Sequence, residues 1–442
     1  MQIQAHHNMH GVNCLSRMNW STLRLLIGHA YNEISSSFPA VYNQNKEVSD
    51  YPLKHLVDSP HKDGLVRDGL EGVLVMPEHD FLPIQNFDFV EFYVGDAKQS
   101  AFYFSNAWGF TPIAYAGLET GIRDRCSYVL EQGNIRLVIT SPLIPSGEIA
   151  EHVKLHGNGV KTIALRVDDT SKAYQETTSR GAHGVMEPTT LSDDKGVVKL
   201  SAIATYGETL HTFVERSQYG GVFLPGYREI STSVPRRARS AGLAAIDHIV
   251  GNVELGKMNE WVSFYERVMG FTQLIHFDDR AISTEYSALM SKVMQNGSGR
   301  IKFPINEPAL GRRKSQIEEY LDFYYSPGVQ HIALNTDDII STVRNLQERG
   351  VDFLSAPPTY YDHVLDRVGH IDEDIHQIAE LGILVDHDDE GYLLQIFSKP
   401  IGSRPTVFFE VIERKGARGF GEGNFKALFE ALESEQELRG NL

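Results

Sequence analysis

The chain of 442 residues repeats part of its own sequence, and this internal repeat limits its possible folds more than any other feature. Gly159-Val-Lys-Thr-Ile-Ala-Leu165 returns as Gly328-Val-Gln-His-Ile-Ala-Leu334. Two shorter runs also return, Phe92-Tyr-Val-Gly95 as His248-Ile-Val-Gly251 and Thr212-Phe-Val-Glu-Arg216 as Glu410-Val-Ile-Glu-Arg414. Repeats of this kind indicate a fold assembled from copies of one supersecondary unit.

Both halves of the chain show the same order of predicted elements. Apolar runs predict strands at 87–94, 127–130, 135–140 and 160–166, and again at 245–250, 284–289, 301–303 and 329–335. Helical periodicity ended by a glycine predicts helices at 98–108, 171–180, 259–269 and 339–349. Each half therefore has two βαβββ modules. Because one such unit cannot bury its own sheet, we predict an α+β fold in which four modules pair, curl their sheets around cavities and form two open, barrel-like domains.

These predictions divide the chain into four parts. Residues 1–80 carry no copy of the repeat and form an N-terminal extension that we expect to be poorly ordered. A reading frame that truly starts at Met76 and a transit peptide are two alternative origins of this extension. Residues 84–231 hold the first pair of modules, 232–242 form a linker with one proline and three arginines, and 243–442 hold the second pair.

Composition excludes several classes of function. The 41 basic and 58 acidic side chains give a net charge of -17, which does not suit nucleic acid, because phosphate binding needs a basic surface. No run of about 18 apolar residues predicts a transmembrane helix, so we expect no membrane partner. The two cysteines, Cys14 and Cys126, exclude a disulfide framework and favour the reducing cytoplasm.

The two copies of the repeat differ where the second copy has metal-binding side chains. In the register of the repeat, the first copy has Phe92, Thr162 and Thr212 where the second has His248, His331 and Glu410. A single histidine in an apolar strand is most often an ordinary core residue, but an unpaired glutamate buried in a strand costs several kcal/mol. Two histidines and one carboxylate from equivalent strands match a non-haem iron(II) site, which leaves positions open for oxygen and substrate. Catalytic zinc uses similar ligands, but the sequence lacks the helical His-Glu-x-x-His signature.

Two segments near the C-terminus give weaker signals. Asp386-His387-Asp388-Asp389 has the residue types of a metal site, but its position at a turn favours a solvated loop. Gly419, Gly421 and Gly423 lack the spacing of a phosphate or dinucleotide loop. We expect them to form a hinge before a final helix, Phe425 to Arg439, that covers the cavity as a lid.

An ordered set of motifs runs through the chain. It comprises Phe223-Leu-Pro-Gly-Tyr227, Ile246-Asp-His-Ile-Val-Gly-Asn252, Phe303-Pro-Ile-Asn-Glu-Pro308, Lys314-Ser-Gln-Ile317, Val329-Gln-His-Ile-Ala-Leu334, Pro358-Thr-Tyr-Tyr361, Glu380-Leu-Gly-Ile-Leu-Val-Asp386, Leu393-Leu-Gln-Ile-Phe397, Arg404-Pro-Thr406 and Gly419-Phe-Gly-Glu-Gly-Asn-Phe425. With these motifs, the chain from about Asn86 to its C-terminus resembles the 4-hydroxyphenylpyruvate dioxygenase family of the vicinal-oxygen-chelate superfamily.

The resemblance implies glyoxalase-like modules, Fe(2+) as the cofactor and a 2-oxo acid and O2 as partners. The expected reaction is decarboxylation of 4-hydroxyphenylpyruvate, ring hydroxylation and side-chain migration, which yield homogentisate and CO2 in tyrosine and phenylalanine catabolism. The first half is then expected to be a non-catalytic partner within a homo-oligomer, a dimer or a tetramer.

The resemblance also implies which side chains bind the substrate. They are Ser291, Asn306, Gln316, Gln330, Gln395, Phe397, Phe408 and Phe425. Of these, Gln395 and Asn306 are also expected to act in catalysis. Gln330 directly precedes His331, so along an ideal strand it should point away from the metal.

Three alternatives remain open. Hydroxymandelate synthases share the fold, iron and substrate but hydroxylate the benzylic carbon, although Pro304 and Phe397 match the ring-hydroxylating pattern. Catechol-cleaving dioxygenases share the architecture, but the motifs from Asn306 to Phe425 do not match theirs. A non-catalytic small-molecule-binding protein of the same fold is the third alternative, and the intact triad in one half disfavours it.

Overall fold

The computed structural model describes residues 80–231, 240–277, 288–309 and 311–440. All of them belong to one compact unit, Gly72–Leu442. The predicted N-terminal extension, apart from Asp80, and most of the predicted linker lie outside the described residues.

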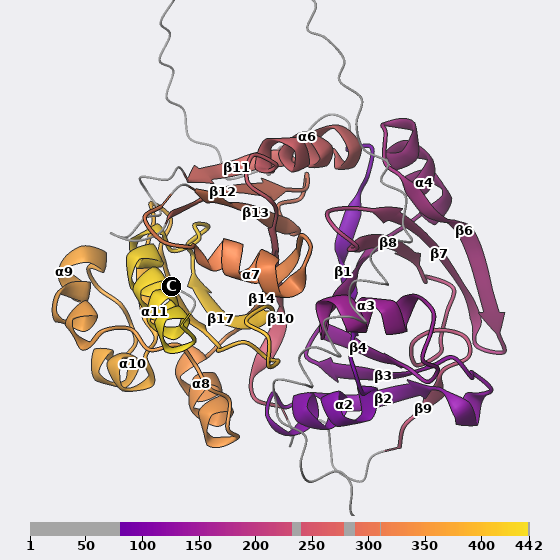
Figure 1. Cartoon of the computed structure of the whole chain (residues 1–442), viewed down its shortest axis with the longest axis horizontal. Coiled ribbons are helices and arrows are strands. Elements are labelled where there is room, and N and C mark those ends of the chain that lie inside the picture. Colours follow the sequence, from indigo (N-terminus) through magenta and orange to yellow (C-terminus); the bar gives the residue numbers. More distant parts are fainter. Residues whose placement is uncertain (1–79, 232–239, 278–287, 310, 441–442) are drawn as a thin grey trace, which may run out of the picture. The chain divides into compact units, whose positions relative to one another are not determined.

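The first half forms a mixed sheet, drawn from indigo to magenta in Figure 1. Its strands are β1 (Ile84–Tyr93), β2 (Thr111–Ala116), β3 (Arg125–Gln132), β4 (Ile135–Pro142), β5 (Gly159–Val167), β6 (Gly184–Asp193), β7 (Gly196–Ala204), β8 (Leu210–Glu215) and β9 (Arg228–Glu229). The helices are α2 (Ala97–Asn106), η1 (Leu118–Thr120), α3 (Glu148–His156) and α4 (Thr170–Ser179). The strand order among the described residues is β6-β7-β8-β5-β1-β4-β3-β2-β9.

The second half forms its own sheet, coloured from rose to yellow in Figure 1. Its strands are β10 (Leu243–Asn252), β11 (Thr272–Phe277), β12 (Ala288–Gln295), β13 (Lys302–Ala309), β14 (Gly328–Thr336), β15 (Leu384–His387), β16 (Tyr392–Phe397) and β17 (Phe408–Lys415). The helices are α6 (Met258–Met269), α7 (Gln316–Tyr324), α8 (Ile339–Glu348), η2 (Pro358–His363), α9 (Val364–Val368), α10 (Ile375–Leu381), η3 (Glu422–Asn424) and α11 (Phe425–Leu438). The described strands are ordered β11-β12-β13-β10-β14-β17-β16-β15.

The two sheets share one plan. In each half the first strands of the two modules pair antiparallel at the centre, β1 with β5 and β10 with β14. Each of these strands also pairs in parallel with the last strand of its own module, namely β4, β8, β13 or β17. The predicted fold of paired βαβββ modules with curled sheets is therefore confirmed.

Repeated sequence signals set the ends of equivalent helices. Asp169 and Asp338 each follow a central strand, and their side chains accept a hydrogen bond from the backbone amide of Lys172 and of Ser341. An aspartate that caps the free amides of the first turn fixes where a helix begins. Gly270, with φ of 69°, ends α6 in the left-handed conformation that favours glycine.

The predicted helices and strands agree with the structure to within a few residues, with two exceptions. The strand expected at 284–289 corresponds to β12, which is described from Ala288 to Gln295, and the strand expected at 301–303 corresponds to β13, Lys302–Ala309. Residues 278–287 lie outside the described residues.

The central strands carry β-bulges at equivalent positions. Between β10 and β14 the register shifts at Asp247 and at Gln330, each of which is an extra residue in its strand. Between β1 and β5 the same shifts occur at Asp88 and Lys161. A bulge breaks the strict alternation of side chains, so two consecutive residues can serve the same face of a sheet.

The two halves contact each other through both sheets and helices. The backbone amide of Asn134 donates to the carbonyl of Ala244, and Asn296 Nδ2 donates to the carbonyl of Ile84. Helix α3 of the first half lies beside α7 of the second (Figure 1), and the ring of His156 stacks on that of Tyr324 at 4.5 Å.

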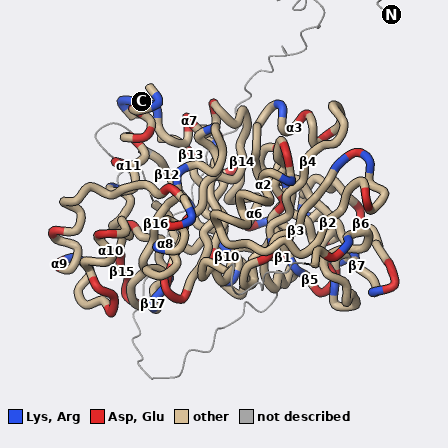
Figure 2. Tube along the Cα trace, turned by 90° about the horizontal axis from the view of Figure 1, so that it is seen from below, with Lys and Arg blue, Asp and Glu red and all other residues tan. Residues whose placement is uncertain are grey.

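Charge is spread along the described chain. In Figure 2, acidic and basic residues alternate around the trace and do not form a separate basic face in that view. Among the described helices, none is long and apolar enough to cross a membrane.

Candidate metal centre and substrate cavity

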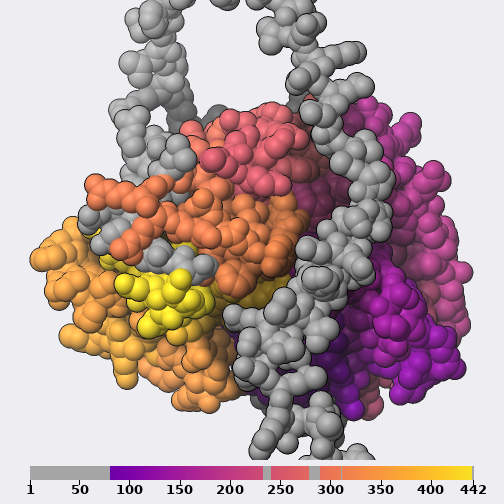
Figure 3. Space-filling model, in the orientation of Figure 1, coloured from indigo at the N-terminus to yellow at the C-terminus, as the bar shows by residue number. Residues whose placement is uncertain are grey.

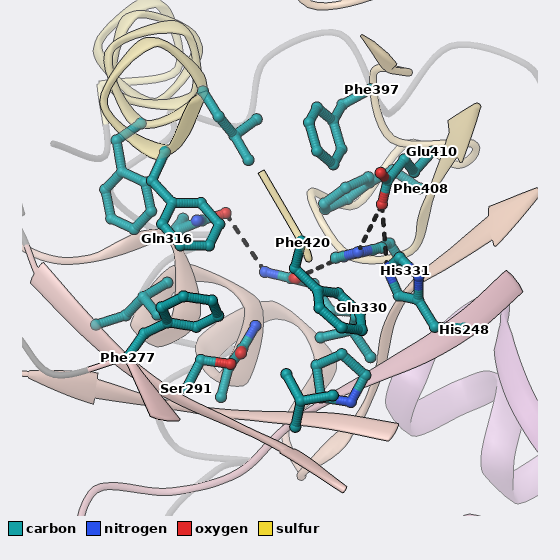
Figure 4. A pocket seen from close by; sticks show the side chains of 18 residues that line it. His248, Phe277, Ser291, Gln316, Gln330, His331, Phe397, Phe408, Glu410 and Phe420 are labelled. Carbon is teal, nitrogen blue, oxygen red and sulfur yellow. Dashed lines mark hydrogen bonds and ion pairs between the residues drawn. The ribbon is translucent and has the colours of Figure 1, made fainter. Parts of the chain in front are cut away.

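Three adjacent central strands of the second half bring two histidines and a glutamate together. His248 lies on β10, His331 on β14 and Glu410 on β17, and their side chains converge in Figure 4. His248 Nε2 is 3.2 Å and His331 Nε2 is 3.4 Å from Glu410 Oε2. The three residues are 3%, 9% and 2% exposed, so little water can solvate their polar atoms.

Strand register explains this convergence. His248 is opposite Ala333 on the neighbouring strand, and Ala333 is opposite Glu410 on the next. His331 lies two residues before Ala333, and residues two apart in a strand face the same side of a sheet. The three side chains therefore extend from one small area of one face.

The protonation pattern of this cluster suits a cation. His248 Nδ1 donates to Asp247 Oδ1 at 2.7 Å, and His331 Nδ1 donates to Gln330 Oε1 at 2.9 Å. With Nδ1 protonated, a neutral imidazole presents the lone pair of Nε2, and both lone pairs face the oxygen of Glu410. Three converging acceptors need a positive charge between them, and a divalent metal supplies it.

The carboxylate of Glu410 is ionised in this setting. Burial alone would raise its pKa, but protons on Nε2 of His248 and His331, through their charge and hydrogen bonds, outweigh burial and lower the pKa to about 2; a cation between the three residues would take the place of those protons. A buried carboxylate that stays charged is a metal ligand ready for use.

Arg414 supports this centre from behind. Its Nε and Nη2 donate to the two oxygens of Asp247 at 2.7 and 2.8 Å. Burial opposes ionisation of Asp247, but the hydrogen bonds and charge of Arg414 hold its pKa well below the ordinary value. Asp247 therefore stays a charged acceptor that fixes the ring of His248.

The expectation that Gln330 points away from the metal is wrong. Gln330 accepts from His331, its Nε2 donates to Gln316 Oε1 at 3.4 Å, and it lines the same cavity. The bulge in β14 is the physical reason, because it brings Gln330 and His331 to the same face.

A cavity opens beside the three ligands, and most of its wall is apolar or aromatic (Figure 4). The lining residues are His248, Val250, Phe277, Leu289, Ser291, Val293, Pro304, Asn306, Gln316, Gln330, His331, Phe397, Phe408, Glu410, Phe420, Phe425, Leu428 and Phe429. A few polar groups in an apolar wall are typical of sites that bind and orient a small molecule.

The structure places all but one of the predicted substrate-binding residues on this wall. Ser291, Asn306, Gln316, Gln330, Phe397, Phe408 and Phe425 line the cavity. Gln395 does not. It lies buried on β16, its Nε2 has no hydrogen-bond partner in the described part of the chain, and a Cβ on Gly421 would come within 2.3 Å of that nitrogen. Gly421 therefore allows the backbone to pass over Gln395.

Helix α11 covers the cavity from the outside. Its residues Phe425, Leu428 and Phe429 line the wall, and the ring of Phe425 packs edge-to-face on Phe277 at 4.9 Å. Figure 3 shows this yellow helix at the surface beside orange residues of the same half. Near its end, Arg439 forms two hydrogen bonds with the carboxylate of Glu319 on α7.

The segment 386–389 was expected to be a solvated turn, and this holds for His387 and Asp389, which are exposed, but not for Asp386 and Asp388. Asp386 is 6% exposed, is paired with Arg367 at 2.7 Å and accepts from the amide of Gly423. Asp388 accepts from the amides of Arg418 and Gly419. These carboxylates anchor the glycine-rich segment that precedes α11, so this segment is attached to the sheet at several points.

The structure corrects one of the three repeat correspondences. Thr162 and Thr212 do occupy the places of His331 and Glu410. His248, however, is opposite Ala333 as Phe89 is opposite Ala164, so its counterpart is Phe89 and not Phe92. The similarity of the two short runs suggested a register three residues away, because both contain Val followed by Gly.

Several residues that shape the site were not predicted from the sequence. Asp247, Arg414 and Phe420 were not singled out, although the pairs Asp88–Arg216 and Asp247–Arg414 recur in the two halves. That recurrence of an acidic and a basic residue at matched repeat positions is the signal that would have identified them. Phe420 gave no such signal, because its place depends on the path of a loop.

Two family models match the chain. The model described as "Hydroxyphenylpyruvate dioxygenase, HPPD, N-terminal" matches residues 79–223. The model of the "Glyoxalase/Bleomycin resistance protein/Dioxygenase superfamily" matches residues 245–395. The two matches fall on the two sheets described above.

Whole proteins and a solved structure are also similar. The 4-hydroxyphenylpyruvate dioxygenase of Dictyostelium discoideum is 48% identical over 367 residues, which cover 81% of this chain and 100% of that protein. The protein of the same name from Aspergillus fumigatus is 47% identical over 379 residues, covering 81% of this chain and 94% of its own. A mutant of 4-hydroxymandelate synthase from Streptomyces coelicolor has a TM-score of 0.72 and 32% identity, covering 80% of this chain and 100% of its own. The chain therefore belongs to the 4-hydroxyphenylpyruvate dioxygenase family.

Proposed function

We propose that this protein is an iron(II)-dependent dioxygenase that converts 4-hydroxyphenylpyruvate and O2 to homogentisate and CO2. One observation carries the proposal. His248, His331 and Glu410 converge in an aromatic-lined cavity of the second half, whereas the same places in the first half hold Phe89, Thr162 and Thr212. Family membership and relatives of the same name support this reaction.

The donor set fits iron(II) held by His248, His331 and Glu410. Two imidazoles and one carboxylate leave positions open, and this is the usual ligand set of non-haem iron oxygenases. The iron would supply activation of oxygen and an anchor for the 2-oxo acid. Asp247 and Gln330 would keep the two imidazoles in the tautomer that presents Nε2 to the metal.

The remaining residues would bind and orient the substrate. Phe408 stacks on His331 at 5.0 Å and Phe397 packs edge-to-face on it at 5.9 Å, so both rings border the metal ligands. With Phe425 they would hold the aromatic ring of the substrate. Ser291, Asn306, Gln316 and Gln330 offer hydrogen bonds to the phenol and the oxo acid.

Two residues would also act in catalysis, and they differ in position. Asn306 reaches the cavity directly and would orient the reacting group. We propose that Gln395 acts indirectly, by supporting the loop at Gly421. Its unpartnered amide lies against the backbone of that loop and not in the cavity wall.

A second candidate is hydroxymandelate synthesis. The likeness to a 4-hydroxymandelate synthase structure favours it, since fold and substrate class would be shared. The relatives at 47% and 48% identity carry the dioxygenase name, so ring hydroxylation is the preferred reading.

Oxygen uptake with 4-hydroxyphenylpyruvate tests the proposal. The iron(II)-loaded protein should consume O2 and release homogentisate, identified by chromatography. A hydroxymandelate product would replace the main proposal by the second candidate. No uptake with iron bound would contradict both and would favour a binding protein or a different 2-oxo acid.

The proposal extends to organisation and location. We propose that 84–231 and 243–442 act as a non-catalytic and a catalytic domain joined by 232–242, after an N-terminal extension at 1–80. We further propose a cytoplasmic homo-oligomer, a dimer or a tetramer. Light scattering of the purified protein would test the assembly, and a monomer at micromolar concentration would contradict it.

A further inference from the structure

A second cluster of two histidines and a carboxylate lies in the first half, outside the catalytic machinery. His152 and His156 lie one turn apart on α3, and Glu208 lies between β7 and β8. One nitrogen of each ring and one oxygen of Glu208 lie within 4.8 Å of one another. Both rings are buried, with His152 2% and His156 1% exposed, while 44% of the Glu208 side chain is exposed.

The dimensions of this cluster resemble those of the catalytic one. His152 Nδ1 is 2.9 Å and His156 Nε2 is 3.5 Å from Glu208 Oε2. The corresponding distances from His248 and His331 to Glu410 are 3.2 and 3.4 Å. In both clusters one carboxylate oxygen lies within ligand-to-ligand distance of two imidazole nitrogens.

The tautomer of His156 leaves its Nε2 atom without a hydrogen-bond partner among the described residues. Its Nδ1 contacts the backbone carbonyl of Tyr324, which can only accept, so Nδ1 carries a proton. In the neutral ring, Nε2 then presents a lone pair toward the oxygen of Glu208, and this buried atom has no hydrogen-bond partner in the described residues. Metal-binding histidines commonly donate their second nitrogen to a carbonyl in this way.

Residues near this cluster offer an explanation of its geometry that needs no metal. Lys161 Nζ is 3.0 Å from Glu148 and 3.8 Å from the same oxygen of Glu208. His152 packs edge-to-face on Tyr93 at 5.3 Å, and its Nε2 has no partner in the described residues. Without a metal, His152 Nδ1 would donate a hydrogen bond to Glu208 Oε2 at 2.9 Å, and Lys161 would supply the positive charge. The two explanations therefore differ in whether a metal or a proton occupies the space between the three ligand atoms.

We propose that His152, His156 and Glu208 form a second metal site, which takes a divalent transition metal and fits zinc best. Imidazole nitrogens and one carboxylate oxygen suit zinc, and three protein ligands leave a position for water on the exposed side of Glu208. Through His156 the site also contacts Tyr324 at the end of α7, the helix whose first residue, Gln316, lines the substrate cavity. The site therefore lies where the two halves meet.

Metal analysis of the full-length, iron-loaded protein tests this site. His6, His7 and His10 should first be replaced by alanine, because they are a separate potential zinc ligand set. After incubation with Zn2+ and removal of free metal, we expect one zinc per chain in addition to iron. Glu208→Gln should weaken zinc retention by more than about 100-fold, because a ligand is lost, while iron content and turnover stay unchanged.

Two further measurements separate this site from the catalytic one. Glu410→Ala should lose iron yet keep its zinc. Co2+ bound to that variant should give the strong visible absorption of a low-coordinate site, and Glu208→Gln in the same background should abolish it. Absence of a second metal, or equal zinc in the parent and Glu208→Gln, would overturn the proposal in favour of Lys161 and a proton. Unchanged turnover of Glu208→Gln in the parent background shows that this variant is folded.

Discussion

Apart from the short strand β9 of the first half, the two halves of the molecule have equivalent strands in the same order, yet one interior is an apolar core and the other contains a cavity. In the first half, Phe89 packs edge-to-face on Phe223 at 5.2 Å within a closed apolar cluster. In the second half, His248 takes the place of Phe89 and faces Phe420 at 4.9 Å beside a cavity. The fold supplies positions, and a few side chains decide whether those positions make a core or a metal centre.

Both halves contain the same arrangement, in which an aspartate pairs with an arginine beside a phenylalanine ring. Asp88 pairs with Arg216, and the guanidinium of Arg216 lies 5.4 Å from the ring of Phe223. Asp247 pairs with Arg414, whose guanidinium lies 5.4 Å from the ring of Phe420. The same arrangement closes an apolar core in one half and supports a proposed metal ligand, His248, in the other.

Loss of the carboxylate ligand should separate the halves most sharply. Glu410→Ala removes one of three ligands and leaves two imidazoles without their shared partner, so iron retention and oxygen uptake should fall by more than about 100-fold. Thr212→Ala, its counterpart, should leave both nearly intact. Iron content and oxygen uptake measure the outcome, and similar losses in the two variants would contradict the assignment of one active half.

Phe223 of the first half and Phe420 of the second should differ in what they contribute: Phe223 mainly to stability, and Phe420 mainly to activity. Phe223→Ala removes a ring that is 1% exposed, and the resulting cavity should lower the free energy of unfolding by about 3–5 kcal/mol. Phe420→Ala, at a half-buried position beside the cavity, should cost about 1 kcal/mol or less and mainly change KM and product distribution. Urea unfolding and steady-state kinetics would show the contrast. A large stability loss for Phe420→Ala would mean that the second interior is also an ordinary core.

Substitution of Asp247 and of its counterpart Asp88 tests the role of the aspartate–arginine pair in each half. Asp247→Asn removes the charged acceptor of His248 and should weaken iron binding by about 10–100-fold. Asp88→Asn should leave iron binding unchanged but destabilise the fold by about 3 kcal/mol, because Arg216 and Arg166 lose a buried partner. Iron titration and urea unfolding of both variants distinguish these roles, and a normal iron affinity in Asp247→Asn would exclude the proposed support of His248.

The smallest effect is expected at the bulge next to His331. Gln330→Met keeps the volume but removes a neutral acceptor from His331 Nδ1, so iron affinity should fall by less than about 10-fold, since neutral hydrogen bonds are weaker than charged ones. Lys161→Met, at the matching bulge of the first half, should leave iron unchanged. A loss larger than that of Asp247→Asn would reverse the expected ranking of the two supports.

Much of the fold could be predicted because the repeat and the periodicity are local signals. Asp169 and Asp338 mark helix starts, and Gly270 marks a helix end, through interactions with their own neighbours in sequence. The proposed metal ligands His331 and Glu410 could be found because the repeats around them align without gaps.

The features that could not be predicted depend on bulges and loops, which a single sequence indicates only weakly. The bulge at Gln330 reverses the expected direction of a side chain, and the register of β1 moves the counterpart of His248 to Phe89. Gln395 lies outside the cavity wall because the loop at Gly421 passes over it. Strand pairing and loop path are properties of the assembled sheet, and periodicity alone does not contain them.

Arg414 connects the candidate metal centre to the loop that carries Phe420. Besides Asp247, its guanidinium donates to the carbonyl of Gly419, the residue before Phe420. Displacement of Phe420 by a bound molecule would therefore act on the same guanidinium that holds Asp247, the partner of His248. One side chain thus connects the wall of the cavity to the orientation of a proposed metal ligand.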